Sequence, residues 1–221
     1  MENVTDKISN PFGMSPPCDH YCNDSTERQA VYGYGDVNAD FHVIGDHPNI
    51  HGGKETGIPF THTNSEEYIL DLLEDVGFID NRELQEPMVN NCFLSYLYLC
   101  CLPDGAEPSQ RDYTEFERFF DAELRAIAAD VLIPVGETAT RHVLETYTAK
   151  AVKSSLDMAD LHGSNIHGSG FLVIPLLDPQ KWNADIYSQA YSSLQDILDS
   201  DYHQIADLGR FLVGSDPYYV R

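Results

Sequence analysis

Four short apolar segments, separated by segments with helical spacing of apolar residues, constrain the fold of this chain most strongly. The apolar segments cover residues 41–44, 92–99, 131–135 and 171–177. Helical spacing is found in segments 66–76, 112–129 and 184–198, and another helix is expected to begin after Gly136. A near-continuous apolar run suits a strand covered on both faces, and strand–helix alternation favours parallel pairing. We therefore predict an α/β fold, a three-layer α/β/α sandwich around a central, mostly parallel four-stranded sheet.

The whole chain, residues 1–221, is predicted to form a single domain. Residues 1–40 are rich in turn-forming proline and glycine and are interpreted as an irregular N-terminal arm. Residues 200–221 are interpreted as a C-terminal tail. No apolar run has membrane-spanning length, and the first residues do not resemble a signal peptide. We therefore expect a cytoplasmic monomer without membrane contact.

The charge balance restricts the partners of the chain, because 36 acidic and 13 basic residues give a formal net charge of −23. An acidic surface repels DNA, whose phosphates are normally contacted by Lys and Arg. In about 1 M salt the Debye length is roughly 3 Å, so this repulsion acts only near contact. We interpret the composition as halophilic. The alternative is an acidic protein that mimics DNA or binds a basic partner.

The first apolar segment runs directly into Gly45-Asp46-His47-Pro48, and Gly57-Ile58-Pro59-Phe60 follows after a glycine-rich loop. Glycine and proline end a strand abruptly, so a carboxylate and an imidazole lie at the strand's C-terminal end. Open α/β sheets form ligand crevices at that end, which predicts an active-site loop. An ordinary turn capped by Asp46 is the alternative. The other loop histidines, among them His51 and His162, are predicted to be solvent-exposed.

These two motifs resemble the first motif of the uracil-DNA glycosylase superfamily, and the nearest branch is family 4, the iron–sulfur type. The resemblance covers roughly residues 12–200 and extends to Cys100-Cys101-Leu102-Pro103 and Leu177-Asp178-Pro179. It implies a DNA glycosylase that hydrolyses the N-glycosidic bond of uracil or another deaminated base in base-excision repair, and the acidic composition indicates a haloarchaeal origin. DNA containing a damaged base would be the partner. The alternative is a catalytically silent relative that binds nucleic acid or a protein through the same crevice.

The resemblance assigns roles to residues of the first motif. Asp46 matches the motif carboxylate, which positions water or stabilises positive charge on the sugar. Phe60 matches the phenylalanine that stacks on the base, and the alternative is a core phenylalanine that closes the loop. Gly45 and Pro48 belong to the same loop and are carried over as substrate-binding residues. His47 stands at a small-residue position, where it is either a donor to base or water or an exposed loop histidine.

Two departures from the family pattern concern the contacts to the base. Where the family has an asparagine that reads uracil, this chain has the substrate-binding candidate Tyr96, with one hydroxyl and more bulk. The family's late histidine, which donates to the leaving base, is replaced by the catalytic candidate Asp178. An ionised aspartate only accepts hydrogen bonds. Three explanations stay open: His47 substitutes, Asp178 stays protonated, or the pocket reads another base such as hypoxanthine.

Five cysteines, with a close pair near the N-terminus, favour a metal or cluster over disulfides in a reducing cytosol. The resemblance implies one 4Fe-4S cluster, and three of the family's ligand positions are matched, by Cys18, Cys22 and Cys100. The fourth position falls near Phe116, so Cys101 or His20 would have to complete the site. A bound cluster and an empty, degenerate site both stay open.

Overall fold

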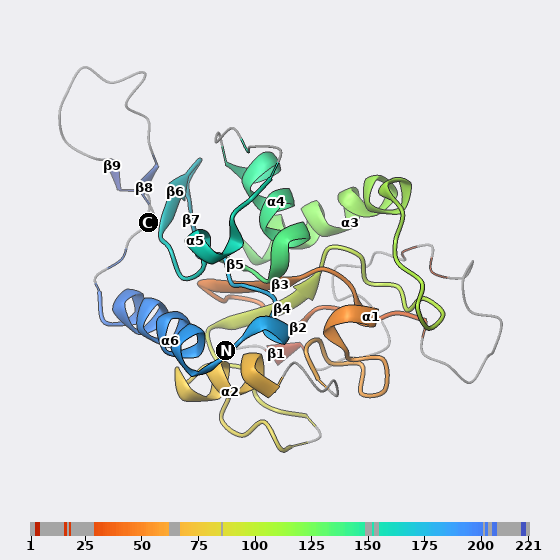
Figure 1. Ribbon diagram of the computed structural model, residues 1–221, viewed down its shortest axis with the longest axis horizontal. Helices are drawn as coiled ribbons and strands as arrows, with labels where there is room; N and C mark the ends of the chain where they lie inside the picture. Colours follow the sequence, from red (N-terminus) through yellow and green to blue (C-terminus); the bar gives the residue numbers. More distant parts are fainter. Residues whose placement is uncertain are drawn as a thin grey trace.

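The computed structural model centres on a seven-stranded sheet with the strand order β1-β2-β4-β3-β5-β7-β6 (Figure 1). The residues that the structure describes are 3–4, 16, 18, 29–61, 67–84, 86–148, 152, 155–200, 202, 205–206 and 218–219. The strands of this sheet are β1 (Asn3–Val4), β2 (Tyr34–Asp36), β3 (Phe41–Gly45), β4 (Cys92–Tyr96), β5 (Val131–Pro134), β6 (Ile166–Gly168) and β7 (Phe171–Val173).

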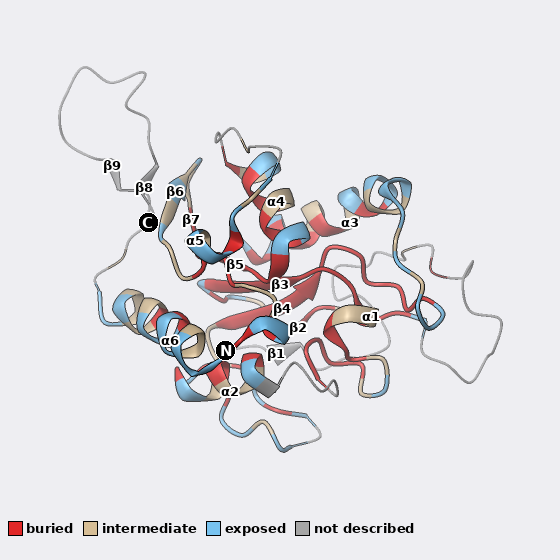
Figure 2. Cartoon of the chain, viewed as in Figure 1, coloured by how far each residue is buried: buried red, intermediate tan, exposed pale blue. Residues whose placement is uncertain are grey.

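The four strands at the centre of the sheet, β4, β3, β5 and β7, pair in parallel and are the four that the apolar segments predict. Their residues are almost all buried, as Figure 2 shows for the middle of the molecule. The predicted strand count was wrong, because β1, β2 and β6 extend the sheet by antiparallel pairing. These outer strands have only two or three residues each, which is too short to show an alternating pattern.

The helices lie on both faces of the sheet, as predicted for a three-layer sandwich (Figure 1). Their bounds are α1 (Pro48–His51), α2 (Glu67–Asp75), α3 (Gln110–Ile127), α4 (Gly136–Tyr147), α5 (Met158–Leu161), α6 (Ala184–Leu198) and a 3-10 helix, η2 (Pro179–Lys181). Helices α2 and α6 share one core cluster, and α3 and α4 share another. Helix α3 begins two residues before its predicted start, because Ser109 and Asp112 form a reciprocal capping box.

The predicted irregular arm is partly regular, because β1 and β2 from residues 1–40 form one edge of the sheet. In the predicted tail, β8 (Ile205–Ala206) and β9 (Tyr218–Tyr219) pair as antiparallel strands. In the part of the chain that the structure describes, no helix is long and apolar enough to cross a membrane.

The carboxyl ends of β3, β5 and β7 meet at one edge of the sheet. An isolated parallel bridge between Val135 and Leu176 continues the pairing of β5 with β7. In addition, the backbone N–H of Gly136 donates to the carbonyl of Leu176 over 2.9 Å. The start of α4 is therefore held against the segment that follows β7, which is where a ligand crevice is expected.

Candidate active site

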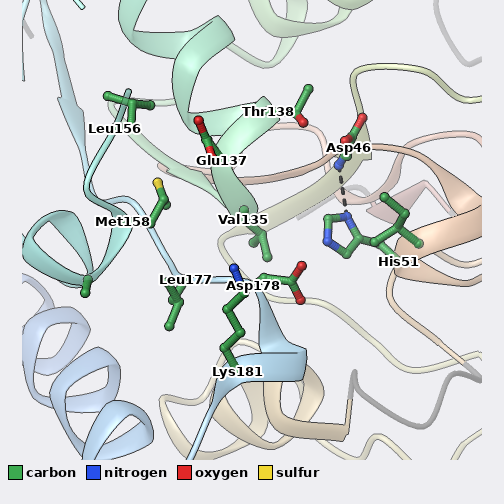
Figure 3. A pocket seen from close by; sticks show the side chains of 13 residues that line it. Asp46, His51, Val135, Glu137, Thr138, Leu156, Met158, Leu177, Asp178 and Lys181 are labelled. Atoms are coloured by element: carbon green, nitrogen blue, oxygen red, sulfur yellow. Dashed lines mark hydrogen bonds between the residues drawn. The ribbon is translucent and has the colours of Figure 1, made fainter. Parts of the chain in front are cut away.

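A cavity of about 460 Å³ lies at this edge of the sheet (Figure 3). Apolar side chains such as Val135 and Leu177 form part of its wall. Its polar lining side chains are Asp46, His51, Glu137, Thr138, Asp178 and Lys181. Asp46 and Thr138 lie at one end, and Asp178 and Lys181 at another (Figure 3). The structure therefore brings together two of the predicted catalytic residues, Asp46 and Asp178, which are far apart in the sequence.

Asp46 follows the last residue of β3 and is only 7% exposed. Its carboxylate accepts a hydrogen bond from the Tyr113 hydroxyl of α3. Burial raises the pKa of Tyr113, and the charge of Asp46 raises it further, so the phenol stays protonated and keeps donating. The carbonyl of Asp46 accepts from the backbone N–H of Tyr98 over 3.0 Å. The carboxylate is thus held at the cavity by both α3 and the segment after β4.

His51 ends α1 and is 2% exposed, although the sequence predicted an exposed loop residue. The backbone N–H of Asp46 donates to its Nδ1 over 2.9 Å. Its Nε2 is buried and has no hydrogen-bond partner among the described residues. Burial lowers the pKa of His51 to about 4, although the negative charge of Asp46 acts in the opposite direction. The ring is therefore neutral near pH 7.

Tyr96, Phe60 and Gly45 lie close to His51 and are not among the residues that line the cavity. The Tyr96 hydroxyl accepts from the Phe60 N–H over 2.8 Å and donates to the His51 carbonyl over 2.7 Å. The rings of His51 and Phe60 lie 5.6 Å apart, and Phe60 is 0% exposed. A Cβ on Gly45 would come within 2.7 Å of the Tyr96 ring. Tyr96 and Phe60 therefore support the loop that carries His51, and their contact with a base stays a prediction.

His47 and Pro48 form the start of α1, and both are buried. Burial lowers the pKa of His47. His47 is therefore not the exposed loop histidine of one prediction, and it is not among the residues that line the cavity. The His47 carbonyl accepts from the backbone N–H of His51 over 3.0 Å. Pro48 occupies the first turn of α1, where its missing N–H costs nothing. These two residues shape the turn that buries His51.

Asp178 comes after residues 174–177, which follow β7, and is the N-cap residue of η2. Its Oδ1 accepts from the backbone N–H of Gln180 over 3.0 Å. This bond uses the carboxylate as an acceptor, the role that an ionised aspartate has. Asp178 is only partly buried, so its carboxylate is presented to the cavity from a fixed position.

Two buried side chains fix the residue before Asp178. The backbone N–H of Leu177 donates to Nδ1 of His162 over 2.9 Å, and Nε1 of Trp182 donates to the Leu177 carbonyl over 2.7 Å. His162 is buried, in contrast to its predicted exposure. Its Nε2 lies 2.9 Å from the carbonyl of Ile186 in α6 and, with Nδ1 as acceptor, donates to it. Helix α6 therefore positions this wall of the cavity.

A family model described as the uracil DNA glycosylase superfamily matches residues 32–195. The chain belongs to this superfamily. One curated relative is the type-5 uracil-DNA glycosylase of Pyrobaculum aerophilum, which is 24% identical over 169 residues. The aligned part is 75% of this chain and 72% of the relative. The superfamily prediction is confirmed, whereas the name of this relative gives type 5 where the sequence motifs predicted family 4.

Of the predicted cluster ligands of this superfamily member, the structure describes Cys18, Cys100 and Cys101. Cys18 and Cys100 form a disulfide, contrary to the preference for a metal over disulfides. Phe116, which stands near the fourth family position, packs in the same core cluster as this pair, whereas Cys101 packs in another. Cys22 and His20 lie outside the described residues. Within those residues, no three His, Cys, Asp or Glu side chains are arranged to hold a metal ion.

Sequence reasoning missed His51 as a residue that lines the cavity. Its burial depends on the one-turn helix α1 and on Tyr96, which stands on a different strand. A local signal was present, because Pro48 favours a helix start and Gly52-Gly53 favour its end. A single turn between them places His51 next to the backbone of Asp46.

Proposed function

We propose that the chain is a DNA glycosylase that removes uracil from DNA by hydrolysing the N-glycosidic bond, as the first step of base-excision repair. Its superfamily supports this reaction class, and the name of the type-5 relative supports uracil as the base. The observation that carries the proposal is the cavity of about 460 Å³ that contains both Asp46 and Asp178. A volume of this size is in the range of small-molecule sites, roughly 300–1,000 Å³.

The reaction requires a base that has left the stack, because the bond to the sugar is shielded inside a duplex. As that bond breaks, positive charge develops on the sugar and negative charge on the base. The Asp46 carboxylate stabilises the positive charge and orients the attacking water. Tyr113 holds the carboxylate in place through its hydroxyl, which reduces the reorganisation that the transition state needs.

Asp178 provides the contact that selects the base. Uracil and hypoxanthine carry a ring N–H that an ionised carboxylate can accept, whereas cytosine has a lone pair at the corresponding ring nitrogen of uracil. A carboxylate facing that position attracts the N–H and repels the lone pair. Because Asp178 is fixed through Gln180, turning it away from cytosine would break its bond to the backbone. The deaminated base is therefore preferred.

The test is base release from oligonucleotides that carry uracil, hypoxanthine or xanthine, in multimolar potassium chloride. The matched control is Asp46→Asn, which keeps an oxygen for the Tyr113 hydroxyl and removes the charge. Release of uracil that the control lacks supports the proposal. Binding of uracil-containing strands without release of any base would replace it with a catalytically silent relative.

Further predictions concern the origin, the branch, the location, the oligomeric state and the cofactor of the protein. The net charge of −23 supports activity in concentrated salt and a haloarchaeal origin. The branch, the cytoplasmic location and the monomeric state stay predictions. The 4Fe-4S cluster also stays a prediction, and iron and sulfide analysis of anaerobically purified protein tests it. No step of the proposed reaction depends on such a cluster.

A further inference from the structure

The negative charge that develops on a leaving base needs a hydrogen-bond donor. Three of the six polar lining residues, Asp46, Glu137 and Asp178, are carboxylates and can only accept when ionised. The donors are His51, Thr138 and Lys181. Thr138 and Lys181 are exposed, whereas His51 is buried. A donor acts most strongly where water is excluded, which singles out His51 among the lining residues.

The proton position on His51 follows from its backbone contact. A backbone N–H can only donate, so the bond of 2.9 Å from Asp46 requires Nδ1 to be the acceptor. The neutral ring then carries its proton on Nε2. This tautomer does not change when a ligand enters, because the Asp46 N–H is part of the backbone after β3.

The Nε2–H of His51 has no partner among the described residues, although the atom is buried. Figure 3 shows this edge of the ring turned toward the Val135 and Asp178 side of the cavity. Buried donors are almost always hydrogen-bonded, so an unpaired one beside a cavity indicates a ligand acceptor. The acceptor that the proposed reaction supplies is an oxygen of the base.

We propose that His51 is a catalytic residue whose Nε2–H donates a hydrogen bond to the carbonyl oxygen of the departing base. This inference rests on the proposed function. In the step, the electron pair of the C1′–N bond moves onto the base as that bond breaks. The water oxygen bonds to C1′, and the water proton passes through Asp46 to solvent. The base leaves as an anion stabilised by His51, which keeps its proton, and takes a proton from solvent.

The surroundings of His51 hold the ring at a fixed angle. Tyr96 stacks at 6.3 Å between ring centroids and holds the His51 carbonyl through its hydroxyl. Gly45 leaves room for both rings, because a Cβ there would lie 2.9 Å from the His51 Nδ1. The low pKa of about 4 keeps the ring neutral when no base is bound. A neutral donor in a rigid setting is suited to charge that appears only in the transition state.

Two variants distinguish hydrogen-bond donation by His51 from its contact with the Asp46 backbone. In His51→Asn, the side-chain oxygen can still accept from the Asp46 N–H, but the distal donor is lost. In His51→Gln, an amide N–H can occupy the place of Nε2. Each is compared with the wild type in single-turnover release of uracil and of 5-fluorouracil from the same oligonucleotide sequence. Fluorine stabilises the base anion, so 5-fluorouracil depends less on a donor.

We expect His51→Asn to slow uracil release about 100-fold, the effect of removing one oxyanion donor. Release of 5-fluorouracil by His51→Asn should slow about ten times less, so the ratio of the 5-fluorouracil rate to the uracil rate rises. His51→Gln should recover part of the lost rate of uracil release. The ratio does not depend on the fraction of folded enzyme. An unchanged ratio, or a wild-type rate in His51→Asn, would overturn the assignment. A wild type that releases neither base would overturn the proposed function itself.

Discussion

Gly45 is the residue on which the positions of Tyr96 and His51 depend. The backbone of Gly45 lies so close to the Tyr96 ring that an added methyl group would lie 2.7 Å from ring carbons. We expect Gly45→Ala to lower the free energy of unfolding by about 1–3 kcal/mol, the usual cost of overpacking a core. Chemical denaturation measures it. Because Gly45 does not have a left-handed φ, backbone strain does not contribute to this loss. An unchanged free energy of unfolding in Gly45→Ala would contradict the packing argument.

The carboxylate of Asp178 is expected to set base selectivity. Asp178→Asn keeps an oxygen for the Gln180 N–H but adds an N–H donor that tolerates the cytosine lone pair. We expect uracil release to fall about tenfold, the loss of one charge-assisted contact. The preference for uracil over cytosine should become smaller. Competition between uracil- and cytosine-containing strands measures both. Unchanged discrimination would assign selectivity to another side chain.

Single residues differ in how far the sequence could predict them. Asp46 and Asp178 directly follow apolar segments, so the topology of a parallel sheet brings them together. Tyr96 was assigned to the base, yet its hydroxyl is used by the backbone of Phe60 and His51. The direction in which a buried side chain points on its strand depends on register. A pattern of apolar residues does not fix the register of neighbouring strands.

At the scale of elements, α3 carries a buried carboxylate that makes stability depend on pH. Burial raises the pKa of Glu123 to about 8, while a hydrogen bond to Ser95 acts in the opposite direction. The native state binds this proton more tightly than the unfolded chain. The contribution of the protonated Glu123 carboxyl group to stability is therefore complete below about pH 4.5 and is lost as the pH rises toward about 8.

We expect Glu123→Gln to remove this loss, so that stability relative to the wild type increases from about pH 5 to pH 8. The full difference is at most roughly 5 kcal/mol, from about 1.36 kcal/mol per pKa unit. Burial lowers the pKa of His42 to about 3, so this histidine destabilises the native state only below about pH 6.5. That effect is the same in the wild type and in Glu123→Gln. Denaturation at several pH values measures the difference. Exposed Glu117→Gln on the same helix is the control, and parallel curves for Glu123→Gln would contradict the expectation.

The elements that the sequence predicted are those with a sustained pattern. The four parallel strands and the helices α2, α3, α4 and α6 each show an apolar run or helical spacing over several turns. The short elements β2, β6 and α1 lack that length. Their conformation depends on pairing with neighbours, such as β2 with β4, so tertiary contacts decide them.

At the scale of the whole molecule, an acidic protein must still contact the phosphates of DNA. Many of the described basic side chains are committed to carboxylates, in the pairs of Lys54, Arg82, Arg111, Arg125 and Arg141. Lys181 is exposed at the cavity, one turn after Asp178. It is therefore positioned to contact a phosphate beside the extruded nucleotide.

We expect Lys181→Gln to weaken DNA binding and to reduce the slope of log affinity against log salt by about 1, the loss of one phosphate contact. Fluorescence anisotropy over a potassium chloride series measures this slope. Lys54→Gln, which removes an ammonium already paired with Asp104, should leave it nearly unchanged. If the two variants behave alike, Lys181 does not contact the backbone of DNA.

The most direct test of the proposed function is single-turnover release of uracil by the wild type and by Asp46→Asn, in multimolar potassium chloride. The wild type should release uracil and leave an abasic site. The variant should be at least about 100-fold slower, with an unchanged thermal unfolding midpoint. No release by the folded wild type would contradict the glycosylase function, and equal rates would contradict the role of Asp46.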